Sequence, residues 1–354
     1  MDITVLIARY LGEKRPQYIG QVIGGSIVVF ALISAVLFVV LVGFARPISV
    51  LMQAPEEALG LTSGYVRICG AGIFFIVAYN LLAAIFRGLG DSQSPLLFVL
   101  VACIVNVFGD LFLVAGLHLD AASAAIATLA AQAASVVCAV IMLLKKHLPF
   151  KLCKADFRLN PQCRKFLSIG LPLALQEFLT QLSFLALCAF VNRLGLEASS
   201  GYGVACKIVN FAMLIPSALM QSMAAFVSQN IGAGSKKRAR QSMFTGIGIG
   251  LAFGCAVFAN AFAYLKGFAP ETIATAVLFS MVGYFNGNNK TVWVMVQGLV
   301  QTLLVRLPMA YFMSIQPNAS LTMIGLAAPT STAVGIVLNI CFYFYFERTS
   351  RSDS

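Results

Sequence analysis

The sequence predicts an all-α polytopic membrane protein whose helices form two lobes related by an internal repeat. Of its 354 residues, 60% are hydrophobic and only 10% are charged, whereas about a quarter of the residues in soluble domains are charged. Apolar stretches of about 20 residues, long enough to cross a bilayer as a helix, recur along the whole chain. These stretches lack the polar face that a helix bordering water needs.

The repeat appears as two short alignments of the chain with itself. Ala8–Lys14 aligns with Ser228–Gly234 at an offset of 220, and Phe86–Gly88 aligns with Phe285–Gly287 at an offset of 199. Duplicated halves within one apolar chain are typical of transporters. The decrease in offset predicts that the second copy is shortened between residues 258 and 263.

We expect about ten membrane-spanning helices out of a complete set of twelve. Residues 166–222 have no counterpart in the first copy, so the two absent helices would precede Met1. Residues 3–11 would then be the end of the second of them, and residues 45–63 an outside loop. Corresponding helices would lie six apart, so both copies would have the same membrane orientation, as in a parallel repeat. The expected spans are residues 19–44, 64–86, 95–117, 121–144, 166–192, 201–227, 241–262, 264–285, 292–314 and 324–346.

A basic, polar stretch divides the predicted lobes. We expect residues 1–144 to form the first lobe, 145–165 a cytoplasmic linker, and 166–354 the second lobe. The linker contains Pro149 and Pro161, which are expected to stop helices.

The positive charge of the chain gathers on one side of the predicted membrane. Placing the linker in the cytoplasm also puts the basic residues near the C-terminus there, which is the positive-inside bias. We therefore attribute the net charge of +11 to topology in an inner membrane, with a cytoplasmic C-terminus, and expect no nucleic-acid partner. The linker is expected to attract anionic lipid headgroups without a specific site. Nine cysteines and two histidines show no metal-ligand spacing, so we expect no metal site.

Charged residues deep in membrane segments are costly and are functional candidates by default. We expect only two acids, Asp110 and Glu177, to lie well inside apolar helices. Asn106 precedes Asp110 by four residues, so both project from one helix face. A carboxylate and an amide oxygen suit a proton or a hard cation; the alternative is a structural hydrogen bond between helices. Glu177 would attract a cationic substrate or pair with Lys207.

Arg306 precedes Pro308 by two residues. Its long side chain would either reach toward the membrane surface or pair with an acid inside the helix bundle.

Five short motifs are spread over nearly the whole chain: Phe86–Ser92 followed by Pro95, Asn106–Asp110, Ala124–Thr128, Gly170–Pro172 with Gln176, and Val305–Pro308. In these motifs and their order, the sequence resembles the multidrug and toxic compound extrusion (MATE) transporters, prokaryotic branch. This resemblance implies two six-helix lobes around a central cavity. It also implies export of cationic amphipathic compounds in exchange for protons or sodium ions, without enzymatic chemistry or a cofactor other than the coupling ion.

The same resemblance implies roles for particular residues. Asp110, Asn106 and Thr128 would belong to a cation site in the first lobe. Glu177 and Gln176 would bind substrate or a cation in the second lobe. We expect the partners to be small cationic substrates and the lipid bilayer, with the protein acting as a monomer.

Three alternatives remain open at this stage. In the first alternative, the chain is a shortened product of such a transporter and no longer transports. In the second alternative, the protein flips lipid-linked precursors. That function requires a basic cavity wall, and the helix interiors offer only Lys207 and Arg306. In the third alternative, the protein is an intramembrane prenyl transferase. That enzyme requires clustered acids to hold magnesium, and a lone Asp110 argues against it.

Overall fold

The computed structural model describes residues 2–51, 56, 59–116, 121–146, 153–192, 206–207, 209–261, 269–316 and 320–352. Within these ranges all regular secondary structure is helical, so the all-α polytopic class is confirmed. Seven of the described helices are long and apolar enough to cross a membrane, or eight if a bent pair of helices counts as one span. The chain divides into two compact units, Leu6–Phe166 and Met1–Val5 with Leu167–Ser354. The lobes expected at 1–144 and 166–354 stay a prediction.

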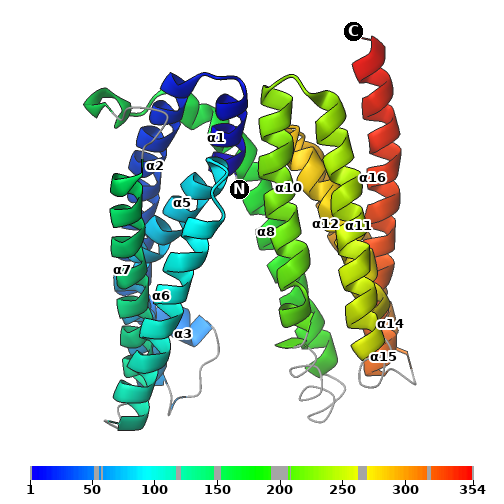
Figure 1. Ribbon diagram of the computed structural model, residues 1–354. Helices are drawn as coiled ribbons and strands as arrows, with labels where there is room; N and C mark the ends of the chain where they lie inside the picture. The colour runs from blue at the N-terminus through cyan, green and yellow to red at the C-terminus, as the bar shows by residue number, and fades with distance from the viewer. Residues whose placement is uncertain are drawn as a thin grey trace. The chain divides into compact units, whose positions relative to one another are not determined.

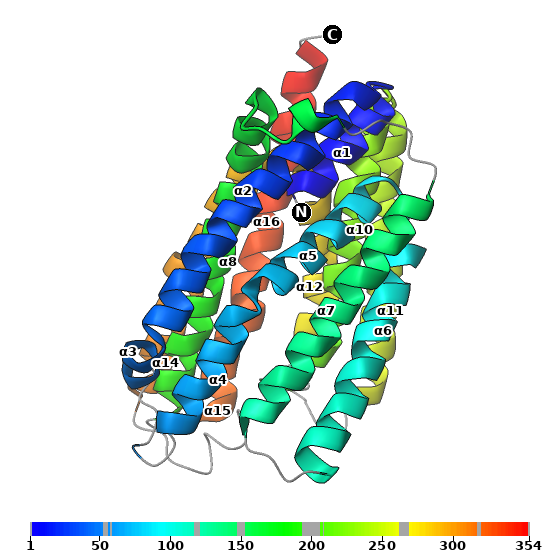
Figure 2. The same ribbon diagram turned by 90° about the vertical axis from the view of Figure 1, so that its left-hand side faces the viewer.

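The first unit is built around one helix, α7, against which α4, α5 and α6 pack, while α2 lies on α4 and α5 (Figure 2). A small core joins Ala83, Phe86, Phe98 and Ala139. The chain begins with α1 (Asp2–Gly12), and the elements of this unit are α2 (Pro16–Gly43), α3 (Ala45–Leu51), α4 (Leu59–Ala71), α5 (Ile73–Gly88), α6 (Gln93–Asp110), the π-helical turn η2 (Leu111–Gly116), α7 (Ala121–Lys145) and the 3-10 turn η3 (Lys154–Asp156).

The second unit has its core where α10, α11 and α12 pack together (Figure 1). Gly283 and Gly287, one turn apart on α12, allow α10 to come close, because a Cβ at these positions would lie 2.7 Å from the Met220 carbonyl oxygen and 2.8 Å from that of Ala224. The elements of this unit are α8 (Pro161–Asn192), α10 (Leu214–Gly232), α11 (Lys236–Ala261), α12 (Ala269–Gly287), α13 (Thr291–Leu299), the π-helical turn η4 (Val300–Arg306), α14 (Leu307–Ser314), α15 (Leu321–Gly325) and α16 (Ala327–Ser352).

Two expectations about breaks in the helices are wrong. The stretch 45–63 was expected to be a loop, but α3 occupies its start and α4 begins at Leu59. Pro161 begins α8 instead of ending a helix, because the first turn of a helix needs no backbone N–H donor. A 48° bend separates α4 from α5. Pro149 and most of the shortened junction, residues 262–268, lie outside the described residues.

The predicted repeat recurs in the backbone. Lys14 (φ 55°) and Gly234 (φ 73°) both end helices in the left-handed region and are 220 residues apart, and Gly90 (φ 81°) and Asn289 (φ 59°) are 199 residues apart. Each end closes with the long hydrogen bond of a Schellman motif. These bonds run from the N–H of Arg15 to the carbonyl of Tyr10 (3.0 Å), Ser235 to Asn230 (2.8 Å), Asp91 to Phe86 (3.0 Å) and Lys290 to Phe285 (2.9 Å). The two registers read from the sequence therefore correspond to equivalent helix ends.

Candidate functional site

The candidate cation site lies where α6 packs along α7 in the first unit. Asn106 on α6 donates a hydrogen bond from Nδ2 to Oγ1 of Thr128 on α7, at 3.3 Å. The helices approach closely here because a Cβ at Gly109 would lie 3.0 Å from the Cβ of Ala127. Two residues that were predicted to share a site, Asn106 and Thr128, are therefore in contact.

Asp110 is the last residue of α6, one turn beyond Asn106 and directly before η2. Its Oδ1 atom is buried and has no hydrogen-bond partner. No ion pair joins it to a basic side chain among the described residues. Tyr65 of α4 is close enough for its hydroxyl to interact with the charge of Asp110. A buried carboxylate oxygen without a partner is costly in a membrane protein, and a bound proton or cation would satisfy it.

The chemistry of this group of side chains is that of a hard-cation or proton site. Because Asn106 uses its amide N–H₂ toward Thr128, its carbonyl oxygen is left to accept a proton or coordinate an ion. Asp110 and Asn106 lie about 6 Å apart along the helix axis, so both oxygens border the same space beside α7. Oxygen ligands of this kind are preferred by hard cations.

Glu177 and Gln176 are neighbours in sequence, but they lie on different faces of α8. Glu177 is exposed and accepts a hydrogen bond from Nε2 of Gln181 at 3.0 Å. No ion pair joins it to Lys207 in the described part of the chain. Gln176 packs on α13, where a Cβ at Gly298 would lie 2.7 Å from its Cγ. The structure does not bring these two residues together.

The expectation that only Asp110 and Glu177 are deeply placed acids is wrong, because Glu271 on α12 is 6% exposed. Its Oε2 atom is buried and has no hydrogen-bond partner, and the charge that acts on its carboxylate is that of Arg306. The sequence signal was present: Glu271 falls within the expected span 264–285. It follows Pro270 at the start of α12 and so has the sequence pattern of an ordinary first-turn acid.

Arg306 is also buried, at 6% exposure, so it does not reach toward the membrane surface. Its Nε donates to Oγ of Ser331 on α16 at 3.2 Å, and its guanidinium lies 4.9 Å from the ring centroid of Phe184 on α8. Glu271 and Arg306 thus place two opposite charges inside the second unit.

Neutral polar side chains continue from this pair along α13 and α16. Gln297 donates to Gln301 at 2.5 Å, and Trp293 Nε1 donates to Asn339 Oδ1 at 3.0 Å. Gly335 allows α16 to come close, because a Cβ there would lie 2.7 Å from Gln297 Nε2. These hydrogen bonds join α13, η4 and α16, while Gln297 Oε1 and Asn339 Nδ2 are buried without a partner.

Asp91, in the turn between α5 and α6, has a structural role. It accepts hydrogen bonds from the backbone N–H groups of Gln93 and Ser94, both at 3.1 Å, from the Ser94 hydroxyl, and from the ammonium of Lys146. Burial alone would raise its pKa, but the bonds from Lys146 and Ser94 prevail and lower the pKa of Asp91 to about 2. Asp91 therefore joins the start of α6 to the end of α7.

Comparison with known proteins gives a consistent pattern. A model of the MatE family matches residues 3–112 and 172–266, more than half of the chain. YoeA, a probable multidrug resistance protein of Bacillus subtilis, is 26% identical over 252 residues, which cover 69% of this chain and 54% of that protein. An FAD transporter of Shewanella oneidensis is 26% identical over 215 residues, covering 59% and 48% of the two chains. The chain spans about half the length of the curated relatives it matches.

Solved structures with the same fold cover the whole chain. A MOP superfamily transporter from Pyrococcus furiosus, for which a reversed polarity of the binding pocket suggests a different function, matches with a TM-score of 0.92 at 17% identity. The match covers 100% of this chain and 84% of that one. A MATE structure in the bent conformation matches with a TM-score of 0.89 at 18% identity, covering 99% and 84%. At these identities the likeness concerns the fold.

Proposed function

This chain belongs to the MatE family of multidrug efflux transporters, and from that premise we propose that it exports cationic amphipathic compounds in exchange for protons or sodium ions. The observation that carries the proposal is the buried, unpartnered Oδ1 of Asp110 one turn from the Asn106–Thr128 hydrogen bond. An acid that has no basic partner can bind and release a cation as part of a transport cycle.

The proposed coupling follows from the charge of this site. When Asp110 is ionised and empty, its negative charge is costly in the helix bundle, so a state that admits water or a cation is favoured. When a proton or sodium ion is bound, the charge is neutralised and a closed state becomes accessible. An ion that binds one state more tightly than the other shifts the equilibrium between them, which is the requirement for alternating access.

Substrate class and cellular setting are parts of the same proposal. The described helices that can cross a membrane and the one-sided positive charge support a multi-pass protein of the inner membrane with its C-terminus in the cytoplasm. We propose that it acts as a monomer on small cationic substrates. A lipid-linked precursor would need basic groups facing the substrate, whereas Arg306 is buried against Ser331 and Phe184.

The experiment is uptake of the fluorescent cation ethidium into inverted membrane vesicles that contain the protein, driven by an imposed proton or sodium gradient. We expect gradient-dependent uptake that Asp110→Asn abolishes without loss of protein from the membrane. Asp156→Asn, the same change in an acid of the linker, is the matched control and is expected to retain uptake. Equal gradient-driven uptake by Asp110→Asn would refute the role of Asp110, and transport of FAD in place of ethidium would refute the cationic substrate class.

A further inference from the structure

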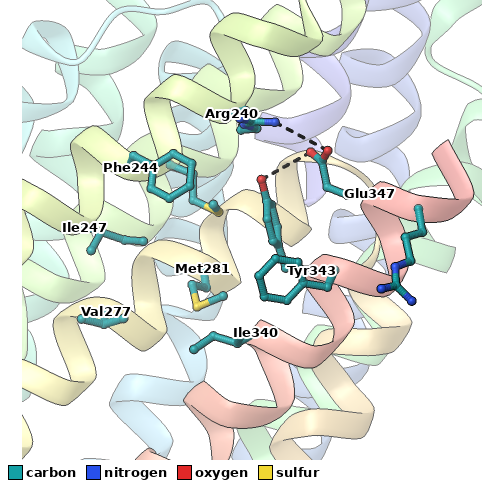
Figure 3. Close-up of a pocket in the computed structure, with 11 residues that line it drawn as sticks. Arg240, Phe244, Ile247, Val277, Met281, Ile340, Tyr343 and Glu347 are labelled. Carbon is teal, nitrogen blue, oxygen red and sulfur yellow. Dashed lines mark hydrogen bonds and ion pairs between the residues drawn. The ribbon is translucent and has the colours of Figure 1, made fainter. Parts of the chain in front are cut away.

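A groove of about 620 Å³ opens between α11, α12 and α16 of the second unit, far along the chain from the candidate cation site (Figure 3). Its two ends differ in chemistry. Arg240, Glu347 and Arg348 line one end. Ile247, Val277 and Ile340 line the other, and methionine and aromatic side chains lie between.

The groove follows the helices, so its length can be worked from the sequence. Arg240 and Ile247 are seven residues apart on α11, as are Glu347 and Ile340 on α16, which corresponds to about 10 Å along each helix axis. The groove is therefore elongated, polar at one end and apolar at the other. An amphipathic chain with a charged headgroup has this distribution of polarity.

The polar end lies at a level of the helices that has the features of a membrane–water interface. Tyr343, Phe344, Tyr345 and Phe346 form an aromatic run next to it, with Phe344 and Tyr345 more than 60% exposed, and aromatic residues concentrate at the headgroup level of bilayers. Lys290 lies with its ammonium 4.8 Å from the ring centroid of Phe346. The apolar end of the groove is thus directed toward the acyl chains.

The repeat adds a second, independent observation. At the offset of 220, Phe244 in the groove corresponds to Gly24 on α2 of the first unit. The linker covers Gly24: a Cβ there would lie 2.4 Å from the carbonyl oxygen of Asp156, and Asn160 donates to the Gln21 carbonyl at 2.9 Å. In the second unit, no segment of the described chain covers Phe244, which is 54% exposed.

We propose that this groove binds one anionic phospholipid, with an acyl chain along Ile247, Val277 and Ile340 and the phosphate at Arg240 and Arg348. Two guanidinium groups and one carboxylate leave a net charge of +1 at the polar end, which matches a phosphodiester. Arg240 Nη1 lies 3.6 Å from Oε2 of Glu347, and the Tyr343 hydroxyl donates to Glu347 at 3.3 Å. Because a guanidinium has five N–H donors, Arg240 can contact Glu347 and a phosphate at the same time.

The test is native mass spectrometry of the purified protein titrated with phosphatidylglycerol, and in parallel with phosphatidylcholine of the same acyl chains. Each basic residue near a bilayer surface contributes about 1 kcal/mol toward anionic lipid, so the double variant R240Q/R348Q is expected to bind the first phosphatidylglycerol roughly 10- to 30-fold more weakly. Phosphatidylcholine binding is expected to be unchanged. Ile340→Trp, which fills the apolar end, is expected to weaken binding of both lipids while leaving the basic end intact.

The matched control is K154Q/R158Q, which removes two exposed charges from the linker. Because the linker attracts anionic lipid without a specific site, this variant is expected to weaken binding of the first phosphatidylglycerol much less than R240Q/R348Q does. Equal weakening by both double variants would mean diffuse attraction of basic surfaces and would overturn the proposal. Unchanged binding in R240Q/R348Q would overturn it as well. Glycerol phosphate, which has the headgroup chemistry without acyl chains, is expected not to compete at millimolar concentration; competition would indicate a free-phosphate site.

Discussion

Replacing Arg306 with methionine should destabilise the second unit strongly. Arg306 and Glu271 are each 6% exposed, and the guanidinium also bonds Ser331 and stacks on Phe184. Methionine keeps much of the side-chain volume, so the change removes mainly the charge. It removes the positive charge that acts on the buried Glu271 carboxylate, and removing one of two oppositely charged buried groups costs about 3–5 kcal/mol.

That cost converts into a measurable temperature shift. For a unit of this size, a destabilisation of 1 kcal/mol lowers Tm by about 2–4 °C, so R306M is expected to lower Tm by roughly 6–20 °C. The double variant E271Q/R306M should recover most of the loss, because replacing both charges of a buried pair is often close to neutral.

Unfolding of the second unit can be followed by the fluorescence of a single tryptophan. Trp293 is the only tryptophan in the sequence. It lies in the first turn of α13 and is stacked on Phe342 of α16 with ring centroids 4.1 Å apart. Its fluorescence in detergent therefore reports unfolding of the second unit. Arg158→Met, at an exposed position, is the control and should leave Tm unchanged. A Tm within about 2 °C of the parent for R306M, or a double variant as unstable as the single one, would refute a stabilising electrostatic interaction between Arg306 and Glu271.

Three further changes test the first unit, each followed by circular dichroism or thiol labelling. The pKa of Asp91 is about 2, below its ordinary value of 3.8. The ionised carboxylate therefore stabilises the fold fully above pH 4, and this stabilisation is lost as the pH falls through 2. D91N should abolish this dependence of Tm on pH between 4 and 2. Lys14 has φ 55° where its repeat partner is Gly234, so K14G should stabilise the fold by roughly 0.5–1 kcal/mol, and a lower Tm would contradict the shared helix end. G24A should lift the linker from α2 and speed maleimide labelling of the buried Cys163, whereas G43A, where a Cβ meets nothing within 4 Å, should not.

Eight of the ten expected spans match described helices that are long and apolar enough to cross a membrane, with the bent pair α4–α5 counted as one, because hydropathy is a local property of the chain. Hydropathy over about 20 residues identifies a membrane helix without knowledge of its neighbours. The repeat registers were visible as short residue matches, such as Phe86–Gly88 with Phe285–Gly287. The structure adds that glycine or asparagine, which tolerate positive φ, stands at three of the four Schellman positions. The i, i+4 spacing of Asn106 and Asp110 was equally local. The bond from Asn106 to Thr128 was not, and its prediction depended on the family resemblance.

The second unit was predicted less well because its site depends on how helices face one another. Glu177 and Gln176 are one residue apart, so about 100° separates their directions around α8, and only packing decides that Gln176 meets α13 while Glu177 stays exposed. Glu271 and Arg306 come from different helices, and no periodicity connects them. An acid at the start of a helix and an arginine before a proline each had an ordinary explanation when taken alone.

The two buried acids differ in their charged neighbours, and under the proposed function this bears on which unit binds the coupling ion. The charge of Arg306 acts on Glu271, whereas no ion pair joins Asp110 to a basic side chain among the described residues. In the second unit, a sodium ion near Glu271 would also meet the positive charge of Arg306, which acts on that carboxylate and would repel the ion. In the first unit, Asp110 has a buried oxygen with no partner and a neighbouring amide that is a neutral ligand. Under the proposed function, an exchangeable ion should accordingly be bound in the first unit.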